Sequence, residues 1–187
     1  MHVGVLSFQG DFAEHLEIFR SLGANCCEVR AVKDLHDCTH LIIPGGESTV
    51  MSKFLASSEL DCEIIRRVGE ETLSIYGTCA GAILLAKDVT GKNAPKSLEL
   101  LDITIERNAY GEQTESFETE LQIRGIGTLV QASFIRAPKI SKVGNEVEVL
   151  CNHDGKPVLV RTRRILAGTF HTEVRGELRL HEFFLSL

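Results

Sequence analysis

The 187-residue sequence lacks the features that mark several large classes of protein. No apolar run approaches the roughly 18 residues of a membrane-spanning helix. The first residues, Met1-His2-Val3-Gly4, show neither the basic region nor the long apolar region of a signal peptide. The net charge of −6 argues against a nucleic-acid partner, which would require a basic surface. We therefore expect a cytoplasmic protein with no membrane and no nucleic-acid partner.

Motifs for disulfides, metals and nucleotides are also scarce. The six cysteines form no CxxC pair, so we expect most of them to be reduced and buried. Neither G-x-G-x-x-G nor G-x-x-x-x-G-K-[ST] occurs, which argues against nucleotide binding. Residues 36–40 alternate His, Cys and His, a pattern that can hold zinc, but they lead into an apolar run and no further ligand cluster accompanies them. The sequence therefore predicts no metal and no cofactor.

The first 90 residues alternate short apolar runs with helical patterns, which is typical of a parallel sheet covered on both faces. Asp11 stands where it can cap the first helix, and Ser48 or Thr49 can open another. Ligands of such sheets bind at the carboxyl ends of the strands. Three loops are expected at that edge: Gln9-Gly10, residues 44–48 and Cys79. We predict strands at 3–8, 26–32, 41–43 and 73–76, and helices at 12–22, 48–55, 60–68 (with Ile64, Ile65 and Val68 inward) and 80–86.

The second half contains short strand patterns, several of them alternating, and a closing helix. Asp154-Gly155 is a strong hairpin signal between two of these strands. The absence of repeats, low-complexity tracts and linkers predicts one domain over residues 1–187. We predict short strands at 103–105, 118–123, 131–135, 147–151, 157–161 and 165–170, and a closing helix at 178–185. We expect this half to add antiparallel strands to the sheet.

The most informative segment is Gly77-Thr78-Cys79-Ala80-Gly81. A nucleophile between two glycines, where an apolar run gives way to a helical pattern, is typical of a nucleophile elbow. Such a turn raises the side chain above the sheet, and a helix N-terminus favours thiolate over thiol. The alternative interpretation is a buried thiol in a turn of small residues.

The pair His171-x-Glu173 supplies a base and a carboxylate that could orient it. In an extended segment, residues two apart face the same side, so Glu173 could bond one ring nitrogen while the other faces the thiol. The alternative is two polar residues at the end of a strand. We expect solvated or core roles for the isolated histidines His2, His15, His153 and His181.

Residues 44–48, with the sequence PGGES, either form a simple turn or bring backbone N–H groups toward a developing oxyanion. Taken together, PGGES, GTCAG at 77–81 and His171-x-Glu173 resemble the class I, triad-type glutamine amidotransferases. Three further segments narrow the resemblance to the glutaminase subunits of pyridoxal 5′-phosphate synthase: Gln9-Gly10 with Glu14-His15, RNAYG at 107–111, and FIRAP at 134–138.

This resemblance implies a flavodoxin-like three-layer α/β sandwich, with a mostly parallel central sheet and added antiparallel strands. It also implies a glutaminase that releases ammonia from L-glutamine for a separate synthase subunit making pyridoxal 5′-phosphate (vitamin B6), without a cofactor of its own. The implied catalytic residues are Cys79, His171 and Glu173, with an oxyanion site at Gly46 and Ala80. The implied glutamine-binding residues are Gly46, Glu47, Ser48, Arg107, Ile135 and Arg136.

The sequence departs from the family pattern at two positions. Thr172 stands where proline is common, and Glu112 stands where a basic residue is frequent. Other interpretations remain open: a glutaminase subunit with another partner, such as imidazole glycerol phosphate synthase, a cysteine hydrolase or peptidase of the same fold, or an inactive scaffold. RNAYG and FIRAP argue against the first, and Glu47, Ser48 and Arg107 favour a small amino-acid substrate over a peptide.

Overall fold

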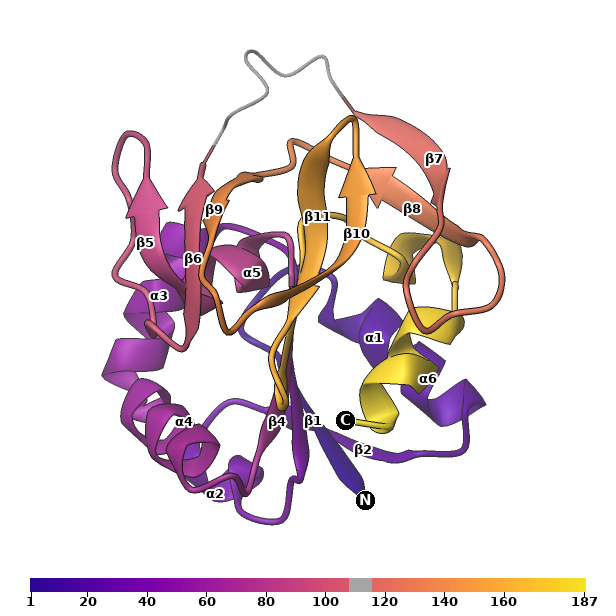
Figure 1. Cartoon of the computed structure of the whole chain (residues 1–187). Helices are drawn as coiled ribbons and strands as arrows, with labels where there is room; N and C mark the ends of the chain where they lie inside the picture. The colour runs from indigo at the N-terminus through magenta and orange to yellow at the C-terminus, as the bar shows by residue number, and fades with distance from the viewer. Residues whose placement is uncertain (108–115) are drawn as a thin grey trace.

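A computed structural model describes residues 1–107 and 116–187 (Figure 1). Residues 108–111 of the RNAYG segment and Glu112 lie outside the described residues. The helices are α1 (Phe12–Ser21), α2 (Val32–Leu35), α3 (Ser48–Ser57), α4 (Leu60–Gly69), α5 (Ala80–Leu85) and α6 (Arg179–Leu185), with a 3₁₀ turn η1 (Glu173–Arg175). The strands are β1 (His2–Leu6), β2 (Asn25–Val29), β3 (His40–Ile43), β4 (Ser74–Thr78), β5 (Ala86–Thr90), β6 (Leu101–Glu106), β7 (Phe117–Leu121), β8 (Val130–Phe134), β9 (Lys139–Val143), β10 (Glu148–His153), β11 (Lys156–Arg161) and β12 (Ile165–Gly168).

The central sheet has seven strands in the order β10-β11-β12-β4-β3-β1-β2. Strands β2, β1, β3, β4 and β12 pair in parallel, and β10 and β11 extend the sheet through antiparallel pairs. The parallel part follows the flavodoxin-like order 2-1-3-4-5, with β12 in the fifth place. The predicted α/β class, with a mostly parallel sheet and antiparallel additions, is confirmed.

Both faces of this sheet are buried because successive side chains of a strand point to opposite sides. In β3, Leu41 and Ile43 join the core beneath α2, α3, α4 and α5, whereas Ile42 joins the core beneath α1 and α6. The two helical layers lie on opposite sides of the sheet in Figure 1. Two small sheets, β5-β6-β9 and β7-β8, stand beside the carboxyl edge.

Several local predictions need correction. The second strand ends at Val29 rather than 32, because Asp34 accepts hydrogen bonds from the backbone N–H groups of Arg30 and Ala31 and turns the chain into α2. The inward orientation predicted for Ile65 is wrong, since this residue is 44% exposed, while Ile64 is buried. The short elements α2, β5 and β9 are absent from the prediction. None of the helices in the described parts of the chain has both the length and the apolar character of a membrane span.

Candidate active site

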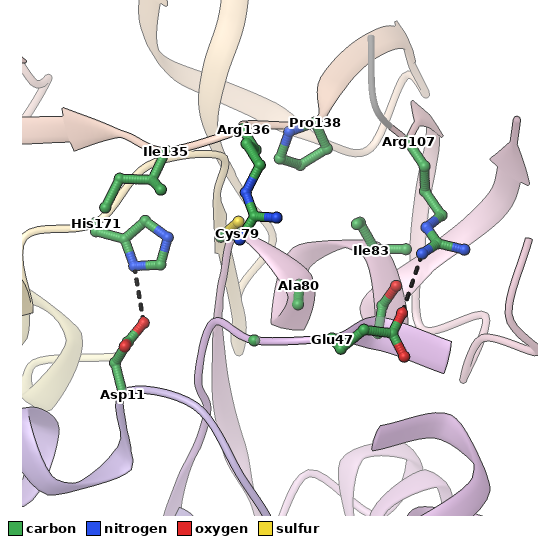
Figure 2. Close-up of a pocket in the computed structure, with 12 residues that line it drawn as sticks. Asp11, Glu47, Cys79, Ala80, Ile83, Arg107, Ile135, Arg136, Pro138 and His171 are labelled. Carbon is green, nitrogen blue, oxygen red and sulfur yellow. Dashed lines mark hydrogen bonds and ion pairs between the residues drawn. The ribbon is translucent and has the colours of Figure 1, made fainter. Parts of the chain in front are cut away.

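The loops at the carboxyl edge of the parallel sheet enclose a cavity of about 410 Å³ (Figure 2). The predicted convergence of the loops after β1, β3 and β4 is observed, and the segment after β12 joins them. Every residue predicted for the site lines this cavity except Glu173, which lies behind His171. The lining residues are Asp11, Gly46, Glu47, Ser48, Cys79, Ala80, Ile83, Arg107, Ile135, Arg136, Pro138 and His171.

Cys79 occupies a strained turn between β4 and α5. Its φ of 49° and ψ of −101° are unusual for a residue with a side chain, and its N–H donates to the Gly168 carbonyl at 2.8 Å. A side chain at Gly81 would clash with the backbone, since a Cβ there would lie 1.9 Å from the Ile43 carbonyl oxygen. The turn leaves Cys79 at the cavity wall with 9% of its surface exposed, the geometry expected of an elbow.

His171 is fixed by backbone and side chain together. Its N–H and C=O both bond to Ser133 of β8 at 2.8 Å, and its Nδ1 lies 2.6 Å from Glu173 Oε1. The two side chains meet as expected, but not on an extended strand: β12 ends at Gly168, and Thr172 has helical dihedrals that place Glu173 at the start of η1.

Thr172, one of the two departures from the family pattern, contributes to the same contact. Its backbone N–H donates to Glu173 Oε2 at 2.8 Å. A proline at this position would lack that donor. The carboxylate of Glu173 is therefore held on both oxygens, by His171 on one and by the Thr172 backbone on the other.

The prediction that Asp11 caps α1 is only half right. Asp11 occupies the N-cap position, but its side chain makes no capping hydrogen bond. Its Oδ2 instead lies 3.3 Å from His171 Nδ1, as Figure 2 shows. Two carboxylates thus approach the same ring nitrogen, which leaves Nε2 as the nitrogen available for the thiol.

The electrostatics of this cluster favour a charged histidine. Burial alone would lower the pKa of His171, but hydrogen bonds to Asp11, Cys79 and Glu173 outweigh it and raise the pKa to about 12. Burial would likewise raise the pKa of Glu173, yet His15 and His171 hold it well below its usual value. An imidazolium beside the Cys79 sulfur is the partner that stabilises a thiolate nucleophile.

His15 belongs to this cluster, although the sequence suggests only an isolated histidine. It is fully buried on α1, with Nε2 3.4 Å from Glu173 Oε1 and Nδ1 2.8 Å from His181 Nε2. Burial lowers the pKa of His181 to about 3, so this ring is neutral. His15 Nε2 is the donor toward Glu173, because a carboxylate oxygen only accepts. One signal was available: His15 lies three residues after Phe12 and four before Phe19, on the apolar stripe of the helix.

Glu47 and Arg107 form the far end of the cavity. Helix α3 begins at Ser48, as predicted, and Glu47 caps it: its carboxylate accepts from the N–H groups of Thr49 at 3.0 Å and Val50 at 2.7 Å. Arg107 Nη2 lies 3.1 Å from Glu47 Oε1 (Figure 2). Partial burial would raise the pKa of Glu47, but these donors outweigh it and lower the pKa. An acceptor and a guanidinium are therefore available side by side.

The segment after β8 closes the third side of the cavity. Ile135 is 37% exposed, and Arg136 has a positive φ of 46°, so the chain turns sharply where these side chains meet the cavity. Thiol, imidazolium, guanidinium groups, carboxylates and loop N–H groups thus surround one small space. This arrangement suits nucleophilic attack on a small amino acid that carries its own charges.

Comparison with known proteins identifies the family. The sequence profile of the SNO glutamine amidotransferase family matches residues 5–187. The chain belongs to this family. The chain is 48% identical over 185 residues to a pyridoxal 5′-phosphate synthase subunit PdxT of Thermus thermophilus, covering 99% of this chain and 96% of the relative. It is 46% identical to the PdxT of Thermoplasma volcanium, covering 100% and 94% of the two chains.

Solved structures agree with this membership of the SNO family. A crystal structure of a glutamine amidotransferase superposes with a TM-score of 0.94 at 44% identity, covering 98% of this chain and 97% of the other. The PurLQS structure from Thermotoga maritima shares the fold alone, with a TM-score of 0.74 at 14% identity. The SNO assignment therefore rests on similarity along the whole chain as well as on the cysteine motif.

Proposed function

We propose that this chain is a glutaminase that hydrolyses L-glutamine to L-glutamate and ammonia and supplies the ammonia to a pyridoxal 5′-phosphate synthase subunit. The observation that carries the proposal is the Cys79–His171–Glu173 arrangement at the wall of a small charged cavity, in a chain whose relatives are named as subunits of that synthase. The product pathway is vitamin B6 biosynthesis. The whole chain, residues 1–187, acts as one glutaminase domain in the cytoplasm.

The first half of the reaction forms a thioester. With the thiol proton of Cys79 held on His171, the sulfur attacks the side-chain carbonyl carbon of glutamine. The oxygen becomes an oxyanion held by the N–H groups of Gly46 and Ala80. His171 then gives its proton to the nitrogen as the carbon–nitrogen bond breaks, which releases ammonia and leaves a γ-glutamyl thioester on Cys79.

The second half regenerates the enzyme. His171 takes a proton from water as the water oxygen attacks the thioester carbon. Collapse of the second tetrahedral intermediate breaks the carbon–sulfur bond and releases glutamate, and the proton on His171 returns to the sulfur. Glu173 orients the ring throughout through its 2.6 Å contact with Nδ1. No step needs a metal or a cofactor.

Substrate recognition follows from the charges around the cavity. A guanidinium of Arg107 or Arg136 suits the α-carboxylate of glutamine, and Glu47 suits the α-amino group. Gly46, Ser48 and Ile135 complete the contacts. The position of the Glu47–Arg107 pair across the cavity from His171 supports an amino acid bound with its side-chain amide at Cys79 (Figure 2).

The test is the Cys79→Ala variant, which we expect to release no glutamate from glutamine while keeping the circular dichroism spectrum and melting temperature of the parent. Undiminished hydrolysis by this variant would rule out the mechanism. A second measurement addresses the partner: turnover should rise sharply with the cognate pyridoxal 5′-phosphate synthase subunit and stay unchanged with an imidazole glycerol phosphate synthase subunit. Hydrolysis of a peptide substrate in place of glutamine would favour the peptidase alternative.

A further inference from the structure

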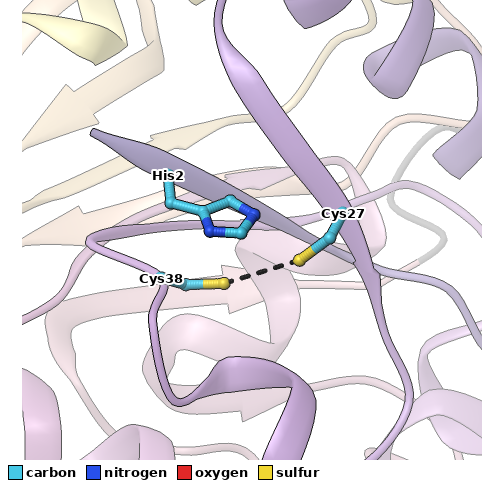
Figure 3. Close-up of side chains that lie close together, drawn as sticks. All are labelled: His2, Cys27 and Cys38. Atoms are coloured by element: carbon cyan, nitrogen blue, oxygen red, sulfur yellow. Dashed lines mark hydrogen bonds between the residues drawn. The ribbon is translucent and has the colours of Figure 1, made fainter.

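A second group of chemically reactive side chains lies away from the active site. His2 begins β1, Cys27 lies in the middle of β2, and Cys38 precedes β3. The group is therefore separate from the cavity, which lies after the carboxyl ends of β1 and β3. The ligand atoms of the three side chains all lie within 4.8 Å of one another. Figure 3 shows the imidazole ring of His2 beside the two sulfur atoms.

The local sequence explains why these side chains converge. Gly4 pairs with Cys27 in the β1–β2 register and has no side chain to separate the two cysteines. A Cβ at Gly4 would lie 3.0 Å from Cys38 Sγ. Cys38 is placed by its N–H, which donates to the Leu35 carbonyl at the end of α2. The group is therefore formed by the sheet register and the α2 turn together.

The spacing matches the corners of a tetrahedral zinc site. With zinc–sulfur bonds of about 2.3 Å, two thiolates on one tetrahedral ion lie roughly 3.8 Å apart. Cys27 Sγ and Cys38 Sγ are 3.7 Å apart. The Asp34 carbonyl oxygen lies 3.8 Å from Cys27 Sγ and 3.4 Å from Cys38 Sγ, so it stands close to both as a fourth corner would.

We propose that His2, Cys27 and Cys38 bind a thiophilic divalent cation of the zinc type, with the Asp34 carbonyl oxygen or a water in the fourth position. Binding releases the two thiol protons to solvent, and the ring of His2 donates a neutral nitrogen. Two thiolates then balance the two charges of the cation. The site is neutral overall, which suits a place that is half buried.

The two thiols share one acceptor. Cys27 Sγ and Cys38 Sγ both donate to the Asp34 carbonyl oxygen. A hard cation such as Mg²⁺ gains little from sulfur ligands, whereas a soft cation can displace the protons. We therefore expect selectivity for Zn²⁺ or Co²⁺ over Mg²⁺.

This site differs from the zinc pattern considered for residues 36–40. His36 Nδ1 bonds to Asp37 at the surface, and His40 Nδ1 bonds to Thr39. Only Cys38 of that segment belongs to the group, and its partners come from β1 and β2. A cation here would link the first strand to the turn before β3, and its role would be to stabilise the fold.

The experiment is a titration of the reduced, metal-free chain with Co²⁺, whose thiolate charge-transfer and tetrahedral absorption bands report the ligands directly. We expect one equivalent to produce both bands, Zn²⁺ to displace the cobalt, and Mg²⁺ to have no effect. Cys27→Ser and Cys38→Ser should each weaken cobalt binding at least tenfold, because each removes one thiolate ligand. Cys26→Ser is the matched control, because Cys26 Sγ faces the Leu16 carbonyl instead.

His2→Ala provides a variant in which neither sulfur is changed, and it should also weaken cobalt binding. Zn²⁺ should raise the melting temperature of the parent but not that of the Cys27 and Cys38 variants. Cys79→Ala should keep the full signal. The proposal is overturned if the parent chain shows no thiolate band with Co²⁺, including after reduction of any Cys27–Cys38 disulfide. It is also overturned if the band survives in Cys27→Ser and vanishes in Cys79→Ala.

Discussion

His15 Nε2 lies 3.4 Å from Glu173 Oε1, although the two residues stand at opposite ends of the chain. We infer that His15 is a positioning residue, since it contacts the carboxylate that orients His171 and not the substrate. A hydrogen bond to a charged group contributes about 1.5–3 kcal/mol, so its loss should lower kcat roughly tenfold or more.

The test compares two amides at position 15. His15→Gln can keep a donor at the place of Nε2 and should retain most of kcat. His15→Asn can keep only the contact toward His181 and should show the tenfold loss, with KM for glutamine unchanged. Equal kcat values for the two variants would contradict a role that depends on the Glu173 contact.

Asp11 provides a prediction about pH. Its carboxylate helps to raise the pKa of His171, so Asp11→Asn should lower that pKa toward the ordinary value. The protonated ring is needed to give a proton to departing ammonia. The alkaline limb of the kcat profile should therefore move to lower pH in the variant. A profile with an unchanged alkaline limb would show that Asp11 does not influence the ring.

Gly45 provides a steric prediction. A Cβ there would lie 2.3 Å from His171 Cε1 and 3.0 Å from Asp11 Oδ2, so Gly45→Ala should push the ring out of line. Misplacement of a reacting group by about 1 Å can cost roughly a hundredfold in rate, and we expect a loss of this order. Gly127→Ala is the control, because nothing lies within 4 Å of its Cβ position. Glutamate release and melting temperature should be measured for both variants.

Gln9 provides a prediction about the partner. Its Nε2 donates to the Glu47 carbonyl at 2.7 Å, so it holds the loop that carries the proposed oxyanion residue Gly46. We expect Gln9→Ala to reduce the activation produced by the synthase subunit more than it changes KM for glutamine. Similar effects on both quantities would count against a role in sensing the partner. Turnover with increasing amounts of the synthase subunit separates the two cases.

The periodic parts of the fold could be predicted from the sequence because each has a strong local signal. The apolar runs of β1, β3 and β4 and the helical spacing of α1 and α4 are of this kind. The elbow could be predicted as well, because Gly77 and Gly81 flank Cys79 in the sequence. The structure shows the reason for both glycines, since a Cβ at either position would lie too close to backbone atoms. Strands β5 and β9 carry no such signal: Lys87 and Lys142 are exposed, and their pairing depends on β6, which lies far from β9 in the sequence.

Some contacts of the active site and of the His2–Cys27–Cys38 group could not be predicted from the sequence for a similar reason. Asp11 resembles an ordinary helix cap, and its contact with His171 exists only because β1 and β12 belong to one sheet. His15 and Cys38 likewise meet partners that only the tertiary structure brings near. Local patterns identify which residues can react, whereas long-range register decides which of them are neighbours.

The place of β12 in the sheet has a consequence for the order of events during synthesis. Ile165 pairs with Ile75, and the Cys79 N–H donates to the Gly168 carbonyl. The elbow is therefore completed by β12, which lies in the last quarter of the chain. His171 follows only after that pairing. Contacts between such distant segments form late, because a long loop must close first. A nascent chain therefore carries its nucleophile long before it can use it, and an incomplete chain stays inert toward glutamine.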